Sequence, residues 1–189
     1  MKTPAIKKAL IEIDRVNYVP KELRNSAYQD IPLPIGEEQT ISQPGTVIFM
    51  LELLQPSEGN RILEIGGGSG WVTALLSRLV GDKGFVYSFE INPAVGKFGL
   101  ANLKENRLKN FRYSVGDAKV HWTEFAPYDK IISGAAFPLM YGEMDDLLKK
   151  GGTMVIPTKD FSLKRITKSP NTGNLNLETY YGYVFVPLK

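Results

Sequence analysis

Hydrophobic positions along this chain follow two different periods, and from residue 44 onward segments of the two kinds alternate. Short apolar runs bounded by turn residues predict buried strands, whereas apolar residues spaced three and four apart predict amphipathic helices. Strands are expected for the sequences RILEIG, FVYSFE, FRYSVG, KIISGAA and TMVIP. Helices are expected for a segment that begins at Pro44 and for SGWVTALLSRLV, NPAVGKFGLANLKEN and GEMDDLLKK, the last of them stopped by Gly151 and Gly152.

Strands that alternate with helices form βαβ units, in which successive strands run parallel. The sequence therefore predicts an α/β fold with a doubly wound, mostly parallel sheet. Near the C-terminus, SLKRITKS and LETYYGYVFVPL flank the turn residues SPNTGN. This arrangement predicts an antiparallel C-terminal hairpin.

The N-terminal part of the chain has a different character. Thr3 and Pro4 are typical of a helix start, and apolar residues then repeat at helical spacing as far as Ile13. Residues 16–43 contain three prolines and show no regular pattern. A long irregular segment inside a compact domain is usually functional, so we expect this one to pack over a site.

Composition excludes several kinds of catalytic site. The chain has no cysteine and a single histidine, His121, which excludes thiolate chemistry and multi-histidine metal sites. No nucleophile-elbow motif accompanies His121, which argues against a Ser-His-Asp triad. The net charge of +3 is not concentrated in a basic run, and no segment reaches the ~18 apolar residues of a membrane span. We therefore expect no metal, no nucleic-acid or membrane partner, and a cytoplasmic location.

One glycine-rich loop, in LEIGGGSGW, stands between a predicted strand and a predicted helix. Gly66, Gly68 and Gly70 permit a ligand to approach the backbone closely, because no Cβ intervenes. A dinucleotide fingerprint requires glycine at the next position and a P-loop requires lysine there, but the chain has Trp71. The loop is then either a binding turn, with Glu64 ahead of its glycines, or a tight turn made for packing.

Two acidic residues follow the next predicted strands. Glu90 ends FVYSFE, where a carboxylate accepts hydrogen bonds from ribose hydroxyls in nucleotide-binding sheets. Asp117 follows the next strand and is placed to accept a bond from an adenine amino group, with Ala118 leaving room. The plainer interpretations are a strand-end charge for Glu90 and a helix cap for Asp117. Because parallel strands end at one edge of a sheet, we expect the loop and both carboxylates to form one site.

The polar stretch IGEEQTISQPGTV stands just ahead of the helix that begins at Pro44. Proline suits the first turn of a helix, and Ser42 or Gln43 is placed to cap that helix. Capping is one interpretation of this polar stretch, and a role in the site is the other.

Together these segments closely resemble the protein-L-isoaspartate O-methyltransferase family, which belongs to the class I S-adenosylmethionine-dependent methyltransferases. The resemblance includes VNYVP, AYQDIPLPIG, QTISQP, MLELL, LEIGGGSGW, VGDA, APYDKI, the SGAA strand end and the closing VFVPL. It implies one Rossmann-like methyltransferase domain over residues 1–189. Within it, residues 1–43 form the N-terminal helix and substrate-side segment, and residues 44–189 form the cofactor-binding α/β core.

The resemblance also implies a reaction and a set of site residues. The family transfers a methyl group from S-adenosyl-L-methionine to the α-carboxylate of L-isoaspartyl residues in damaged proteins and peptides, leaving S-adenosyl-L-homocysteine. By this resemblance Ser42 is the catalytic residue, isoaspartyl-containing chains are the partners, and a monomer is expected. The positions that match the family's cofactor contacts are Thr40, Ile41, Ser42, Glu64, Gly66, Gly68, Gly70, Glu90, Ile91, Asp117 and Ala118.

The absence of a catalytic histidine or cysteine is compatible with this reaction. A carboxylate with a pKa of about 4 is already ionised at neutral pH, so its attack on a sulfonium methyl group needs no general base. Catalysis then depends on aligning the reacting atoms. Our hypothesis is that Ser42 donates a hydrogen bond to the substrate carboxylate and does not act as a nucleophile.

Several segments depart from the family pattern. Gly45 stands where the family commonly has His or an aromatic residue, and FPLMYGEM replaces a longer loop. GGGSG differs mildly from the family's G-T/S-G-S-G, and residues 159–166 lack an expected Gln and carry added positive charge. These changes leave two alternatives open: a same-family methyltransferase for another peptide carboxylate, and a relative that binds the cofactor or an isoaspartyl chain without turnover. A nicotinamide dehydrogenase is disfavoured by Trp71.

Overall fold

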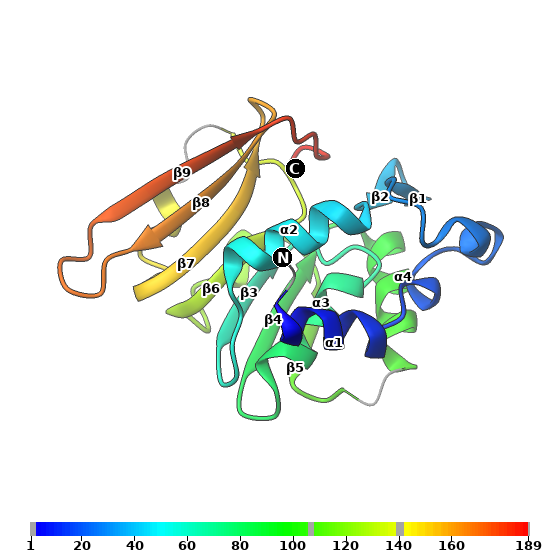
Figure 1. Cartoon of the computed structure of the whole chain (residues 1–189), viewed down its shortest axis with the longest axis horizontal. Coiled ribbons are helices and arrows are strands. Elements are labelled where there is room, and N and C mark those ends of the chain that lie inside the picture. Colours follow the sequence, from blue (N-terminus) through cyan, green and yellow to red (C-terminus); the bar gives the residue numbers. More distant parts are fainter. Residues whose placement is uncertain (1–2, 106–107, 139–141, 189) are drawn as a thin grey trace.

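The computed structural model describes residues 3–105, 108–138 and 142–188. Over these residues the main feature is a seven-stranded sheet with the strand order β5-β4-β3-β6-β7-β8-β9 (Figure 1). Strands β5, β4, β3, β6 and β7 run parallel to one another, β8 is antiparallel to β7, and β9 is antiparallel to β8. The bounds are β3 Arg61–Ile65, β4 Phe85–Glu90, β5 Phe111–Val115, β6 Tyr128–Ser133, β7 Leu148–Thr158, β8 Ser162–Lys168 and β9 Leu175–Tyr181. The α/β class and the antiparallel C-terminal hairpin are thereby confirmed.

Four helices contribute to the core on one face of this sheet. They are α1 Pro4–Glu12, α2 Pro44–Leu54, α3 Trp71–Val80 and α4 Pro93–Lys104. Successive side chains of a strand point to opposite faces, so Ile62 joins the core under these helices while its neighbour Leu63 joins the core on the other face. Figure 1 shows α2 crossing the middle of the sheet, with β8 and β9 extending beyond the helices.

The second face is covered mainly by irregular chain. The short helix α5 Ala118–His121 lies there, together with Trp122, Met144 and Leu147, which are all buried. The expected nine-residue helix GEMDDLLKK is wrong over its described residues. Only a 3-10 turn, η3 Gly142–Met144, is found, and β7 begins at Leu148. Leu148 pairs with Tyr128 of β6, and this sheet pairing overrides the local helical preference.

The proline-rich segment between α1 and α2 has more structure than its sequence indicates. It contains two 3-10 helices, η1 Arg15–Tyr18 and η2 Lys21–Ser26, and a small hairpin of β1 Leu33–Gly36 and β2 Gln39–Ile41. Both turn residues of that hairpin, Glu37 and Glu38, have positive φ. Glutamate is uncommon in that conformation, so the sequence carried no hairpin signal.

Candidate active site

Three connected cavities lie near the carboxyl ends of strands β3 to β6. The first, here called the main cavity, has a volume of about 260 Å³. A small cavity of about 60 Å³ lies beside it. The third, here called the open cleft, is lined by the end of β2, the start of α2 and the chain after β9. Thr40 and Gly134 line all three, so they are parts of one site.

The glycine loop between β3 and α3 forms a wall shared by the main and small cavities. Gly66 and Gly68 line both cavities and have φ values of 80° and 54°. Both residues therefore lie where the sequence predicts a ligand to pass close to the backbone. Gly70 lies outside the cavity lining. A Cβ there would come within 2.8 Å of Leu103 Cγ, so Gly70 serves the packing of α3 against α4.

Three successive amides of the loop, those of Gly66, Gly67 and Gly68, are already hydrogen-bonded within the protein. The N–H groups of Gly66 and Gly67 donate to Phe89 O over 2.8 and 3.1 Å. The N–H of Gly68 donates to Glu90 Oε2 over 2.9 Å. A dinucleotide turn or a P-loop leaves such amides free for phosphate oxygens. These three amides are therefore not available to phosphate oxygens.

The surroundings of Gly67 explain why the loop has the sequence GGGSG, with glycine at its central position. A Cβ at Gly67 would lie 2.4 Å from Ser88 Oγ and 2.5 Å from Tyr113 Cε2. The hydroxyl of Tyr113 donates to Gly68 O over 2.7 Å and so fixes the loop from beneath. Ser88 and Tyr113 thus fill the space that a larger residue would need.

Glu90 is 6% exposed and ends β4 at the wall of the main cavity. Its two carboxylate oxygens accept from the N–H groups of Gly68 and Asn92, each over 2.9 Å. Each oxygen has a further lone pair, and the backbone bonds fix the carboxylate in place. Ile91 follows directly, lines the same cavity and is partly exposed. Glu90 is therefore held in one orientation beside a partly apolar wall.

Asp117 is the N-cap residue of α5 and lies at the main cavity. Its Oδ1 accepts from the N–H of Lys119 over 2.9 Å, so the capping interpretation is confirmed. Asp117 and Ala118 also line the main cavity. The cap engages one carboxylate oxygen, and the other has no hydrogen-bond partner among the described residues.

Glu64 is a buried carboxyl group in the wall of the small cavity, with 2% of its surface exposed. The Thr73 hydroxyl donates to its Oε2 over 2.5 Å. Burial raises the pKa of Glu64 to about 7, although hydrogen bonds from Thr73 and Ser88 oppose this rise; the charge of Glu90 adds to it. A cationic group in the small cavity favours the ionised form of Glu64.

Thr40, Ile41 and Ser42 all line the small cavity, and Ser42 also lines the open cleft. The main-chain carbonyl of Ser42 accepts from Arg15 Nη2 over 3.1 Å. Its hydroxyl has no hydrogen-bond partner among the described residues, so it is available to a ligand.

The interpretation of Ser42 or Gln43 as a side-chain cap of α2 is wrong. Gln43 occupies the cap position without a side-chain bond. Asp30 supplies the cap instead, because its Oδ1 accepts from the N–H of Gly45 over 2.6 Å. A Cβ at Gly45 would lie 2.7 Å from Asp30 Oδ2, so the carboxylate occupies space beside this glycine.

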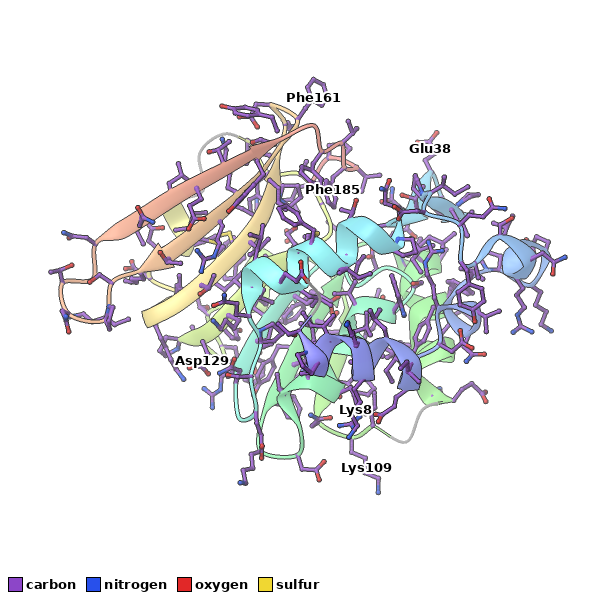
Figure 2. All side chains as sticks on the ribbon, viewed as in Figure 1. Lys8, Glu38, Lys109, Asp129, Phe161 and Phe185 are labelled. Carbon is purple, nitrogen blue, oxygen red and sulfur yellow. The ribbon has the colours of Figure 1, made fainter. Side chains whose placement is uncertain are left out.

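Several lining residues were not predicted from the sequence. Trp122 and Ala135 line the main cavity, and Phe185, labelled in Figure 2, lies above α2 in that view and lines the small cavity and the open cleft. The C-terminal stretch 186–188 also lines the main cavity. It is held there by bonds from Ala136 N to Val186 O and from Leu188 N to Ala136 O, of 2.7 and 2.9 Å. The resemblance included VFVPL, but no local pattern marked it as part of a site.

Among the described residues, none of the helices combines the length and the hydropathy that a membrane-spanning helix requires. Within the same residues, no group of three or more His, Cys, Asp or Glu side chains is arranged to hold a metal ion.

Comparison with known proteins agrees with the geometry of this site. The sequence model of the family "Protein-L-isoaspartate(D-aspartate) O-methyltransferase" matches residues 1–189. A protein-L-isoaspartate O-methyltransferase of Methanothrix thermoacetophila is 39% identical over 180 residues, covering 95% of this chain and 85% of the relative. The enzyme of the same name from Petrotoga mobilis is 41% identical over 183 residues, covering 95% and 84%.

Solved structures agree with this comparison. A structure of a protein-L-isoaspartate O-methyltransferase has a TM-score of 0.86 at 28% identity, covering all of this chain (100%) and 62% of that one. A Plasmodium falciparum protein in complex with S-adenosyl-L-homocysteine has a TM-score of 0.87 at 23% identity, covering 100% and 92%; at that identity it shows the fold alone. From its sequence and its fold, the chain belongs to the protein-L-isoaspartate (D-aspartate) O-methyltransferase family.

Proposed function

We propose that this protein transfers a methyl group from S-adenosyl-L-methionine to the α-carboxylate of L-isoaspartyl residues in proteins and peptides, and that it acts as a monomer. The observation that carries the proposal is the position of the Ser42 hydroxyl. It has no hydrogen-bond partner among the described residues, and it lies where the small cavity meets the open cleft. Ser42 therefore lies between the small cavity, which is assigned to the cofactor below, and the open cleft, through which a peptide could enter.

The main and small cavities fit a nucleoside cofactor that lacks phosphate. Glu90 is oriented to accept from ribose hydroxyls, and the free oxygen of Asp117 is suited to an adenine amino group. The amino-acid end of the cofactor is assigned to the small cavity, which is lined by Thr40, Ile41, Glu64, Gly66 and Gly68. When bound, S-adenosyl-L-methionine supplies an electrophilic methyl group on a sulfonium.

Ser42 orients the acceptor in this proposal. Its hydroxyl donates a hydrogen bond to one oxygen of the substrate carboxylate and leaves the other oxygen free to receive the methyl group. An isoaspartyl carboxylate is ionised at neutral pH, so no residue of the chain has to remove a proton. The contribution of the protein is to position the carboxylate and to exclude water from the reacting atoms.

The charged departure from the family pattern, residues 159–166, lies away from the lining of the site. None of the described residues 159–166 lines the three cavities. Lys164 pairs with Asp160 over 3.2 Å, and Arg165 pairs with Glu178, so these added charges are balanced by nearby carboxylates. The FPLMYGEM segment contains residues 139–141, which lie outside the described residues. The added charges of residues 159–166 therefore give no reason to prefer another peptide carboxylate over the isoaspartyl substrate.

The test uses two peptides of identical sequence, one with an isoaspartyl residue and one with aspartate at the same position. With labelled S-adenosyl-L-methionine, we expect methyl ester formation on the isoaspartyl peptide alone. Equal labelling of both peptides would instead support a carboxyl methyltransferase of different specificity. Binding of S-adenosyl-L-homocysteine with no ester on either peptide would support a relative that binds without turnover.

A further inference from the structure

Arg15 is a buried cation that lies outside the lining of the three cavities. Its side chain is 3% exposed and lies in η1, at the start of the irregular N-terminal segment. Within the described residues, no carboxylate lies within ion-pair distance of it. Burial lowers the pKa of Arg15 to about 10, and the charge of Asp30 opposes this shift. A buried charge of this kind is costly unless hydrogen bonds compensate for it.

The guanidinium is used to hold main-chain carbonyls. Nη1 donates to Ala27 O, and Nη2 donates to Ile31 O over 3.4 Å and to Ser42 O over 3.1 Å. One side chain thus ties together three parts of the N-terminal segment. Nε is buried and has no hydrogen-bond partner within the described part of the chain, so the bonds described here are made by the two terminal nitrogens.

The same guanidinium also contacts the cofactor side of the site. Arg15 Cζ lies 5.3 Å from the ring centroid of Trp71, the first residue of α3 after the glycine loop. The Trp71 indole donates to Ile13 O over 3.3 Å. Ser42 and Trp71 both line the small cavity, so Arg15 lies directly behind two residues of one wall.

No lysine or arginine lines the small cavity or the open cleft among the described residues. An anionic substrate at Ser42 therefore depends on hydrogen-bond donors held in place. The main chain of Ser42 precedes α2, and its carbonyl is outside the helical hydrogen bonding. The Arg15 bond fixes that carbonyl and so limits the directions in which the Ser42 hydroxyl points.

We propose that Arg15 is a positioning residue for methyl transfer, which holds Ser42 and Trp71 from behind the cavity wall without touching the substrate. The inference rests on the proposed function for its reaction, while the contacts themselves do not depend on it. Loss of Arg15 therefore lowers the rate of peptide methylation. It leaves the part of the cofactor site around Glu90 and Asp117 largely intact.

The test compares Arg15→Met and Arg15→Lys with Arg78→Met. Arg78 also ties α3 to the N-terminal segment, through Glu12, but it lines none of the three cavities. We expect kcat/KM for the isoaspartyl peptide to fall on the order of 30-fold in Arg15→Met and about 5-fold in Arg15→Lys, since small misplacements of aligned groups are costly. Arg78→Met is expected to stay within about threefold, and S-adenosyl-L-homocysteine affinity, by calorimetry, within about threefold in all three.

A second readout is independent of activity. The chain has two tryptophans, so in a Trp122→Phe background the fluorescence comes from Trp71 alone. We expect Arg15→Met to shift the Trp71 emission and its quenching by acrylamide, and Arg78→Met to leave both unchanged. If the wild-type protein methylates no isoaspartyl peptide, the proposed function fails, and this fluorescence comparison still decides the Arg15 contacts.

Three results would overturn the inference. The first is a kcat/KM for Arg15→Met within about threefold of wild type. The second is a loss of peptide turnover, cofactor affinity and thermal stability in parallel, which indicates a role in folding alone. The third is an unchanged Trp71 emission in Arg15→Met. If Arg15→Met does not fold, Arg15→Lys carries the test, and full activity in that variant overturns the inference.

Discussion

The two sides of the active-site cleft are built in different ways. On the cofactor side, the bonds that shape the site join the ends of neighbouring strands and the loops that follow them. Glu90 accepts from Gly68, which follows the adjacent strand, and from Asn92, two residues further along. Strand order and register already bring these groups together.

On the substrate side, the bonds join residues that are far apart and in irregular chain. Arg15 holds Ser42 across 27 positions, and Asp30 holds Gly45 across 15. No sheet register fixes these pairs, so each bond depends on a particular side chain. The cofactor side is therefore fixed by the topology of the sheet, whereas single substitutions can change the substrate side.

The largest expected effect is at Ser42. In Ser42→Ala the donor that orients the substrate carboxylate is lost, and misplacement of a reacting group by about 1 Å lowers the rate on the order of 10²-fold. We expect S-adenosyl-L-homocysteine affinity to stay within about threefold, because the cofactor side keeps its own bonds. Methylation of the isoaspartyl peptide under single-turnover conditions, with calorimetry for the cofactor, measures both. An exposed serine remote from the site, Ser57, gives the matched Ser57→Ala control.

Full activity of Ser42→Ala would remove Ser42 from the mechanism. If Ser42→Ala lost as much cofactor affinity as turnover, the cofactor side and the substrate side of the site would not be independent of each other.

The next effect lies on the cofactor side and concerns pH. Burial raises the pKa of Glu64 from 4.5 to about 7, so between those values the folded protein binds a proton that the unfolded chain releases. The unfolding free energy therefore carries a contribution that is present below pH 4.5 and is lost as pH rises through 7. At 1.36 kcal/mol per pH unit, the contribution is on the order of 3 kcal/mol.

Denaturant unfolding of the empty protein at pH 5 and pH 8 measures this contribution, with Glu64→Gln as the reference. We expect stability to fall more steeply with pH in the wild type than in Glu64→Gln. Identical slopes would show that Glu64 is ionised throughout, and that its bonds to the neighbouring hydroxyls outweigh its burial.

Glu90→Gln gives the next effect and acts on the cofactor side alone. In this variant the NH2 group of the glutamine faces the backbone N–H of Gly68 or Asn92, so two donors oppose each other and one hydrogen bond is lost. The negative charge of the carboxylate is lost as well. Hydrogen bonds to charged groups contribute about 1.5–3 kcal/mol, so we expect S-adenosyl-L-homocysteine to bind roughly 10- to 150-fold more weakly. The kcat at saturating cofactor is expected to change little. Titration calorimetry and initial rates separate the two, and a kcat loss without an affinity loss would contradict the assignment of Glu90.

The same division explains what could be predicted from the sequence. Glu64, Glu90 and Asp117 could be placed in one site, because apolar runs locate the parallel strands and the carboxyl ends of such strands meet. The approach of the C-terminal stretch 186–188 to the main cavity could not, because it depends on pairing with Ala136 fifty residues away in the chain. The spacing of apolar residues within a segment carries no information on such a distant contact.

Two misinterpreted segments follow the same rule. The expected helix GEMDDLLKK gives way to strand β7 because Leu148 pairs with β6, a contact that the local sequence does not show. The β1–β2 hairpin turns at Glu37 and Glu38 with positive φ, although neither is a usual turn residue for that conformation. The Asp30 cap of α2 was missed for a related reason, since capping rules consider only residues next to the helix.

The smallest expected effect is at that cap. In Asp30→Ala the N–H of Gly45 loses its acceptor, and loss of a helix cap costs about 1 kcal/mol of unfolding free energy. Thr3→Ala removes a comparable cap from α1, where the Thr3 hydroxyl accepts from Ile6 N over 3.4 Å, and serves as the control. Both variants are expected to melt about 2–4 °C lower than wild type.

The two cap variants should nevertheless differ in activity. Only the Asp30 cap fixes the chain three residues after Ser42, so Asp30→Ala alone is expected to raise the KM for the isoaspartyl peptide, by about twofold to fivefold. Initial rates with varied peptide at saturating cofactor measure this. An unchanged KM in Asp30→Ala would mean that the Arg15 bond is sufficient to position Ser42. The substrate side would then rest on one long-range contact, and the contrast with the sheet-built cofactor side would be sharper still.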